Sequence, residues 1–216
     1  MLQKDVNKLL NRSIKEIAKQ TKWKSSGGFL FRKERNLVFT ALFTVNNKDR
    51  KMFYSLGYKY YDLDSVFWKI MKMESNEKLS LSLRVTGAFT VPMKDISEKT
   101  VLVSEGNPEN LKNAIIRILN NDEKKIVRLA DKIKNIEENN RFLDEWLFKH
   151  KKKYPESAID IHLEKVLGFI LLNDYKTAYK IIRERTLKKD SGGFVSGMKN
   201  FYDSAAEYSE LFVNAS

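Results

Sequence analysis

The pattern of apolar residues changes once along the chain, at Gly106-Asn107-Pro108. Before this point, from Phe29 to Val103, apolar and polar residues mostly alternate, which is typical of β-strands. After it, apolar residues recur every three or four positions, which is typical of α-helices. Asn107 is a residue type that caps helices and Pro108 suits a first helical turn, so we expect a helix to begin there. The sequence therefore predicts a sheet followed by a helical array.

The sheet half contains the signals of two helices and five strands. Val6 to Ala18 has the spacing of an amphipathic helix, and Asp64 is placed to cap a short helix over residues 65–71. Strands are expected over residues 29–32, 36–45, 51–60, 79–91 and 100–103. The strand over 79–91 has the clearest alternation and one apolar face. That pattern is typical of an antiparallel sheet with one face buried and the other exposed to water.

Six helices are expected after Pro108, over residues 108–119, 122–136, 139–150, 156–172, 174–187 and 195–213. Their connections are short, which predicts antiparallel hairpins. A nearly heptad rhythm from Leu111 to Ile136 leaves open that the first two are one long helix. The predicted fold class is α+β: an antiparallel sheet of about five strands with an N-terminal helix, then an all-helical C-terminal array of antiparallel hairpins. Residues 1–138 are expected to form the sheet domain, with strands within 28–103 and helices from 108, and residues 139–216 a helical extension packed on it.

Composition excludes several classes of site. The 216 residues are 42% hydrophobic, a value typical of globular proteins, and include no cysteine. Disulfides, thiolate metal sites and cysteine nucleophiles are therefore excluded. The first residues lack the apolar stretch of a signal peptide, and the longest apolar run, Val166 to Leu172, is too short to span a bilayer. We expect a cytoplasmic protein that has no membrane association and needs no cofactor.

Positive charge is concentrated in the first 60 residues. The formal net charge is +12, and residues 1–60 hold fourteen Lys and Arg against four Asp and Glu, whereas the remaining residues hold twenty-six against twenty-four. A predicted basic surface consists of Lys22, Lys24, Arg32, Lys33 and Arg35. Such a surface steers an acidic partner toward the protein or neutralises the phosphates of a nucleic acid.

Two groups of residues resemble catalytic or metal-binding patterns, and each has a simpler explanation. Asp62 and Asp64 are spaced like a metal or acid–base pair, but a turn and a helix cap explain them better. Asp160, His162 and Glu164 share a face only on a strand, whereas the surrounding periodicity predicts a helix. We therefore expect no metal site and no catalytic residue.

A glycine-rich tetrapeptide, Ser-Gly-Gly-Phe, occurs at residues 26–29 and again at residues 191–194. A glycine-rich turn before a helix can bind phosphate through its backbone N–H groups. Neither copy matches a phosphate-binding loop or a dinucleotide fingerprint. We therefore expect both copies to be connectors.

Two segments resemble known families. Residues 171–179, Leu-Leu-Asn-Asp-Tyr-Lys-Thr-Ala-Tyr, resemble the junction of a tetratricopeptide-like helical hairpin, in which a small residue, here Ala178, admits close helix packing. Residues 56–70 and 81–92, with the early helix, Gly27-Gly28-Phe29 and Phe31-Arg32, resemble the uncharacterised bacterial family called domain of unknown function 4304, over about residues 5–136. That resemblance implies no activity, and it is compatible with an accessory or immunity role.

These observations favour a non-catalytic bacterial protein that binds a protein partner with an acidic surface, and an immunity or antitoxin-like protein fits this description. Contact is expected through the exposed face of the sheet, the helical array or both. Tyr58, Tyr60 and Arg84 are expected to be exposed beside the sheet and to contact the partner. The alternative is a nucleic-acid-associated protein that uses the basic surface of residues 1–60.

Overall fold

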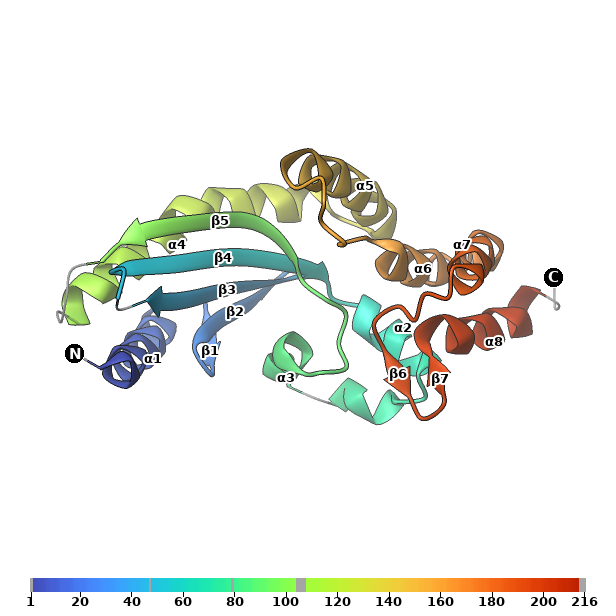
Figure 1. The fold of residues 1–216 in the computed structure, drawn as a ribbon, viewed down its shortest axis with the longest axis horizontal. Helices are drawn as coiled ribbons and strands as arrows, with labels where there is room; N and C mark the ends of the chain where they lie inside the picture. The colour runs from blue at the N-terminus through green and yellow to red at the C-terminus, as the bar shows by residue number, and fades with distance from the viewer. Residues whose placement is uncertain (1, 47, 79, 104–107, 214–216) are drawn as a thin grey trace. The chain divides into compact units, whose positions relative to one another are not determined.

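The computed structural model describes residues 2–46, 48–78, 80–103 and 108–213 (Figure 1). The predicted helix cap at Asn107 lies outside the described residues. Contacts within the chain divide it into two compact units, which are described separately below. Unit 1 is Met1–Lys59, Leu81–Thr86 and Pro92–Lys132, and unit 2 is Tyr60–Ser80, Gly87–Val91 and Ile133–Ser216. The predicted domain boundary at 138/139 stays a prediction.

Unit 1 holds the five-stranded sheet and the helices that pack on it. Its elements are α1 (Gln3–Gln20), β1 (Lys24–Ser26), β2 (Phe29–Glu34), β3 (Leu37–Asn46), β4 (Lys51–Tyr60, whose last residue belongs to unit 2), α3 (Leu81–Thr86), β5 (Lys94–Leu102) and α4 (Pro108–Lys132). The strands lie in the sheet in their chain order, β1-β2-β3-β4-β5. The α+β fold class with an antiparallel sheet of five strands is therefore confirmed.

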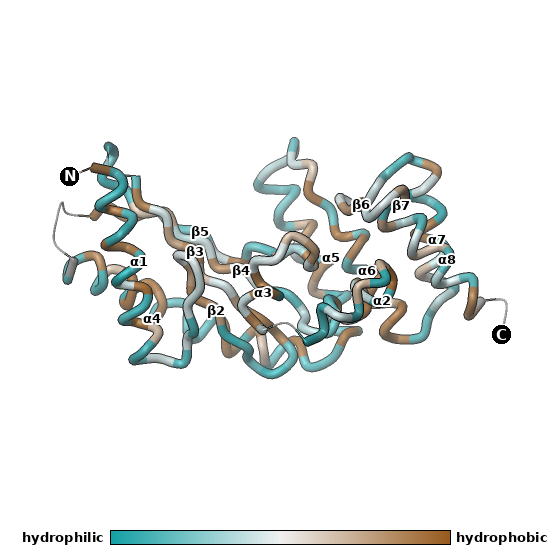
Figure 2. The backbone as a smooth tube through the Cα atoms, turned by 90° about the horizontal axis from the view of Figure 1, so that it is seen from below, coloured by the Kyte–Doolittle hydropathy of each residue, from teal (hydrophilic) through white to brown (hydrophobic). Residues whose placement is uncertain are grey.

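The two faces of the sheet have different neighbours. Alternate residues of β4 from Met52 to Tyr60 are buried, as the period of two predicts, and Tyr54 on that side lies beside Asp122 of α4. Helix α1 packs against α4 and against β1–β3, and its buried side chains follow the predicted helical spacing. On the other side, α3 lies over part of the sheet, where Lys59 Nζ donates to the backbone carbonyl of Arg84 at 2.5 Å (Figures 1 and 2).

The predicted strand over residues 79–91 is wrong. Leu79 lies outside the described residues, Leu81–Thr86 is the helix α3, and β5 takes the position beside β4. The alternation did not mark a buried face, because the side chain of Leu83 is 46% exposed while the arginine after it is buried. In unit 2, the Val91 N–H donates to Asp64 at 2.8 Å and the Phe89 carbonyl accepts from Trp68 at 2.6 Å. Side chains thus form hydrogen bonds with backbone groups that, in a strand, would pair with the backbone of a neighbouring strand.

Unit 2 is mainly helical. Its elements are α2 (Leu63–Ile70), the 3-10 helix η1 (Glu74–Lys78), α5 (Ile136–Lys153), α6 (His162–Leu171), α7 (Tyr175–Leu187), β6 (Val195–Ser196), β7 (Lys199–Asn200) and α8 (Phe201–Val213). Helix α6 packs against α2, α5 and α7, and α7 packs against α8. A cluster of aromatic rings forms part of the core, with the Phe67 ring centroid 4.7 Å from that of Phe194 and 5.8 Å from that of Phe201.

Several helix boundaries differ from the prediction. Residues 108–132 form the single long helix α4 that the heptad rhythm left open. Residues 195–200 form a short hairpin, β6–β7, where a helix was expected, and Gly197 at its turn has a φ of +63°, a value that favours glycine over a helical residue. The junction of the α6–α7 hairpin is where it was expected, although α6 begins at His162 and not at residue 156. Asp174 caps α7 by accepting from the Thr177 N–H at 3.1 Å, and Ala178 is fully buried.

Candidate functional site

One side of the sheet in unit 1 is exposed over β3, β4 and β5. Its side chains alternate with buried ones along β3 and β4 and with half-buried ones along β5, and we call this surface the open face. The open face consists of Leu42, Thr44, Lys51, Phe53, Ser55, Glu98, Thr100 and Leu102. Three cross-strand pairs join β4 to β5 on this face: Lys51 with Leu102, Phe53 with Thr100, and Ser55 with Glu98. The face therefore has an apolar centre with a cation at one end and a carboxylate at the other.

The open face has a hollow of about 360 Å³. Leu42 and Thr44 border it from β3, Phe53 and Ser55 from β4, and Glu98 and Thr100 from β5. Leu42 is 48% exposed and Phe53 is 43% exposed, so both present apolar surface to solvent. The hollow therefore combines apolar walls with hydroxyl groups and one carboxylate.

Beneath the open face, a polar cluster joins β4 and β5 to α4. Lys99 Nζ lies 2.9 Å from Asp122 Oδ1, and Lys125 Nζ donates to Ser97 Oγ at 2.9 Å. Burial raises the pKa of Asp122, but the hydrogen bond from Lys99 and the nearby charge of Lys125 outweigh it and hold that pKa below its usual range. Burial also raises the pKa of Tyr54, and the Asp122 carboxylate raises it further, so the phenol stays protonated at neutral pH. The cluster holds the strands of the open face in place.

The residues of the open face were not predicted from the sequence, and the three residues predicted to be exposed beside the sheet are buried. Tyr58 is 1% exposed, Tyr60 is 6% exposed and Arg84 is 4% exposed, so the expectation that they are exposed is wrong. The period of two placed both tyrosines on one side of β4 correctly, but that side is the buried one. Consecutive apolar residues such as Leu42 and Phe43 carry no signal for which of them faces solvent, because both faces of that stretch look apolar.

The predicted basic surface is divided in the structure. Lys22, Lys24 and Lys33 are exposed, whereas Arg32 is buried. Its guanidinium lies 4.9 Å from the ring centroid of Trp23 and donates to both oxygens of Glu123, at 2.9 and 3.0 Å. Arg35 pairs with Asp131 of α4 at 2.6 Å. Both arginines thus bind carboxylates of the protein itself, and Trp23, at 4% exposure, offers little surface on which a base could stack.

The two carboxylates considered for acid–base chemistry have structural positions. Asp64 is fully buried inside α2, where it accepts from the Val91 N–H. The prediction that it caps this helix is wrong, because Asp62 occupies the cap position and makes no capping hydrogen bond through its side chain. The two side chains therefore lie in different environments, one exposed and one inside unit 2.

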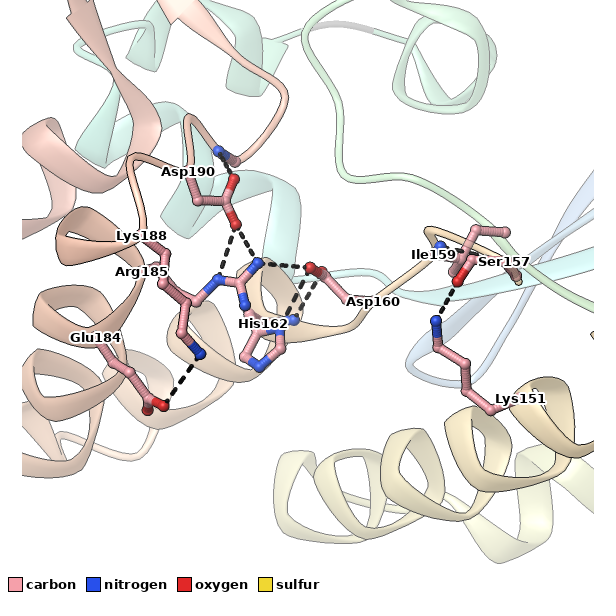
Figure 3. A network of polar contacts seen from close by, with 10 residues as sticks. Lys151, Ser157, Ile159, Asp160, His162, Glu184, Arg185, Lys188 and Asp190 are labelled. Carbon is pink, nitrogen blue, oxygen red and sulfur yellow. Dashed lines mark hydrogen bonds and ion pairs between the residues drawn. The ribbon is translucent and has the colours of Figure 1, made fainter. Parts of the chain in front are cut away.

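The segment before α6 forms an ion-pair network in unit 2 (Figure 3). Arg185 binds Asp160 at 3.0 Å and also pairs with Asp190, and the ring of His162 lies 3.3 Å from Asp160. The hydrogen bond from His162 lowers the pKa of Asp160. Glu164 is buried two residues further on in α6. Among residues 2–46, 48–78, 80–103 and 108–213, no group of three or more His, Asp or Glu side chains could hold a metal ion.

The two Ser-Gly-Gly-Phe segments lie in connections. Gly27 and Gly28 form the turn between β1 and β2, and Gly192 and Gly193 precede the β6–β7 hairpin; all four have positive φ values. This agrees with the prediction that both copies are connectors. Within the described part of the chain, no helix is both long and apolar enough to cross a membrane.

Comparison with protein-family models, with curated proteins and with solved structures gave no match in any of the three. The resemblance to domain of unknown function 4304 and to a tetratricopeptide-like hairpin therefore stays a prediction.

Proposed function

We propose that this is a non-catalytic protein that binds a protein partner through the open face. The observation that carries the proposal is the exposure of Leu42, Phe53 and Leu102, at 48%, 43% and 78%, on one face of three adjacent strands. Other exposed apolar side chains, such as Phe148 and Leu187, lie on separate helices of unit 2. Single exposed apolar residues are ordinary, whereas a grouped set marks an interaction site.

Charge supports a partner with an acidic surface. The net charge of +12 accelerates the approach of such a partner, and Lys51 offers a cation on the open face itself. The exposed lysines Lys22, Lys24 and Lys33 supply steering charge elsewhere in unit 1. An immunity or antitoxin-like protein of the bacterial cytoplasm belongs to this class and is the specific form of the proposal.

The test is affinity purification from the native host with three versions of the protein: the wild type, Phe53→Ser and Phe148→Ser. The second substitution is a matched control, because it removes an exposed phenylalanine, 73% exposed, that lies on α5. We expect the wild type and Phe148→Ser to retain a stoichiometric protein that Phe53→Ser loses. Recovery of no such protein, or equal recovery by Phe53→Ser, contradicts the proposal.

The salt dependence of oligonucleotide binding distinguishes the proposed function from the nucleic-acid alternative. Phosphate neutralisation requires an affinity that falls steeply as salt rises, because counterions are released on binding. Oligonucleotide binding at low salt that is lost in Lys22→Glu and Lys24→Glu would favour the alternative. We expect negligible binding to single-stranded and duplex oligonucleotides, because Arg32 and Arg35 are already paired with carboxylates.

A further inference from the structure

The outer edge of β5 has no neighbouring strand among the residues that the structure describes. β5 is the last strand in the order β1-β2-β3-β4-β5, and within the described part of the chain no strand pairs with its outer side (Figure 1). The Val103 N–H donates to the Arg50 carbonyl at 2.9 Å, so these two residues form a hydrogen-bonded pair of the antiparallel ladder. Such pairs recur at every second residue along the ladder.

The direction of each backbone group in β5 follows from this register. Because the register runs from Lys51–Leu102 to Leu56–Ser97 without a shift, the N–H groups of Lys99 and Val101 point toward β4. Those of Thr100 and Leu102 point away from β4. The same two residues have side chains on the open face, where both are exposed. The free edge and the apolar centre of the open face therefore meet along β5.

We infer that the partner adds an extended segment to β5 as a sixth, antiparallel strand. This inference rests on the proposed function and specifies how the open face is used. An added strand gains main-chain hydrogen bonds from the edge, and its alternate side chains extend the open face. A protein with a long exposed edge normally protects it with a charge, a proline or a covering segment. β5 carries charges at Lys94, Asp95, Glu98 and Lys99, but its last three residues, 100–102, are uncharged, so the protection is weakest at that end.

Cross-strand complementarity specifies the chemistry of the added segment. Leu102, Thr100 and Glu98 are the open-face side chains of β5, in that order from its C-terminal end. Cross-strand neighbours favour apolar with apolar, β-branched with Thr, and opposite charges. An antiparallel segment therefore reads, from N to C, an apolar residue, any residue, a β-branched residue, any residue, and Lys or Arg. The partner is a protein with such a segment exposed.

The test uses phage-displayed random linear peptides selected on the wild-type protein. Selected peptides are then measured against Thr100→Pro and Thr100→Val. Proline removes an N–H that points outward, so the ladder with β4 keeps its hydrogen bonds, while valine keeps the N–H and the branched side chain. We expect the apolar–x–branched–x–basic pattern to be enriched, with affinity about tenfold lower for Thr100→Pro and nearly unchanged for Thr100→Val.

A second variant keeps the test informative if Thr100→Pro unfolds. Glu98→Lys should weaken a selected peptide a few-fold, and exchanging the basic residue of that peptide for Glu should restore binding. Amide hydrogen exchange gives a direct readout: the Thr100 and Leu102 amides should exchange fast in the free protein and slow on peptide binding, while Val101 is protected throughout.

Three outcomes overturn the inference: no enriched peptide, equal affinity for Thr100→Pro as a folded protein, or no change in Thr100 exchange on binding. Failure here is distinguishable from failure of the proposed function. If Phe53→Ser loses the host partner while Thr100→Pro retains it, the open face binds without strand addition. If neither variant loses that partner, the proposed function fails as well.

Discussion

Gly168 of α6 is a position where the usual effect of a glycine-to-alanine substitution should be reversed. In a helix, alanine is more favourable than glycine by about 1 kcal/mol. Here a Cβ added at Gly168 would lie 2.8 Å from Asn140 Nδ2 and 2.9 Å from its Cγ, with Oδ1 closer still, whereas Cβ atoms in real proteins essentially never approach within 3.0 Å. Overpacking of this kind costs about 1–3 kcal/mol. We expect Gly168→Ala to lower the free energy of unfolding by about 1 kcal/mol.

The side chain of Asn140 makes the cause testable. Asn140 is 5% exposed, and neither its amide oxygen nor its amide nitrogen has a hydrogen-bond partner among the described residues. Its truncation to alanine therefore loses no side-chain hydrogen bond, and we expect Asn140→Ala to change stability by less than about 1 kcal/mol. With the amide gone, Gly168→Ala should become stabilising by about 1 kcal/mol.

The assay is urea denaturation followed by tryptophan fluorescence, because Trp146 lies in the same helix as Asn140 and is buried. The four proteins of the double-mutant cycle are compared by their free energies of unfolding. We expect a coupling between the two positions of about 2 kcal/mol. Two results would refute the reasoning: a stabilised Gly168→Ala single variant, or effects that add to within about 0.5 kcal/mol.

Three further predictions concern groups inside the two units. Because the pKa of Asp122 is lowered in the folded protein, its ion pairs stabilise the fold fully above about pH 4, the usual carboxyl pKa. This stabilisation is lost as pH falls through the folded pKa. Urea midpoints measured from neutral to acid pH should therefore fall less steeply in Asp122→Asn than in the wild type. Arg32→Ala should cost about 2 kcal/mol in urea denaturation, because a buried guanidinium loses its two hydrogen bonds to the half-buried Glu123. Lys22→Ala, an exposed control, should cost less than about 0.5 kcal/mol, and equal effects would contradict the pairing. Asp64→Ala should cost about 1–3 kcal/mol by leaving the Val91 N–H without its acceptor, and a neutral result in thermal melting would show that the bond contributes nothing.

Much of the fold followed from local patterns. The first helix, the strand over residues 51–60 and the hairpin around Asn173-Asp174 were predicted to within a few residues. In these segments the period of apolar residues matches burial, because one side of each element packs on a core. Local chemistry also agrees, as at Asp174, whose carboxylate caps α7.

The failure over residues 79–91 has a physical cause. Alternation predicts a strand only if one face is buried, and here burial and alternation do not coincide, since Leu83 is exposed and Arg84 is buried. Asp64 and Trp68 of α2, which lie far back in the sequence, bind the backbone of residues 89–91. The edge strand of the sheet is instead Lys94–Leu102. Every one of its first six residues except Ile96 is charged or carries a hydroxyl, and such residues are not the ones that favour β-strands.

The candidate site shows the same limit. The sheet has an exposed face, as the sequence predicted, but the residues predicted to lie on it, Tyr58 and Tyr60, lie on the buried side. Which side of a strand faces solvent depends on where the helices pack, and that is decided by contacts such as Asp122 with Lys99. Arg32 was likewise predicted to belong to a basic surface, but its guanidinium pairs with Glu123, ninety-one positions later in the sequence.

The amino-acid sequence by itself determined the order of helices and strands in outline, the absence of cysteine chemistry and the concentration of positive charge before residue 61. These properties depend only on composition and on the spacing of apolar residues along the sequence, and both are defined before the chain folds. Only the tertiary structure decided which strand edge is free, which face of the sheet is open and which charges are paired. Those properties depend on contacts between residues far apart in the sequence, and a period of two or of 3.6 contains no information about the partner that covers a face.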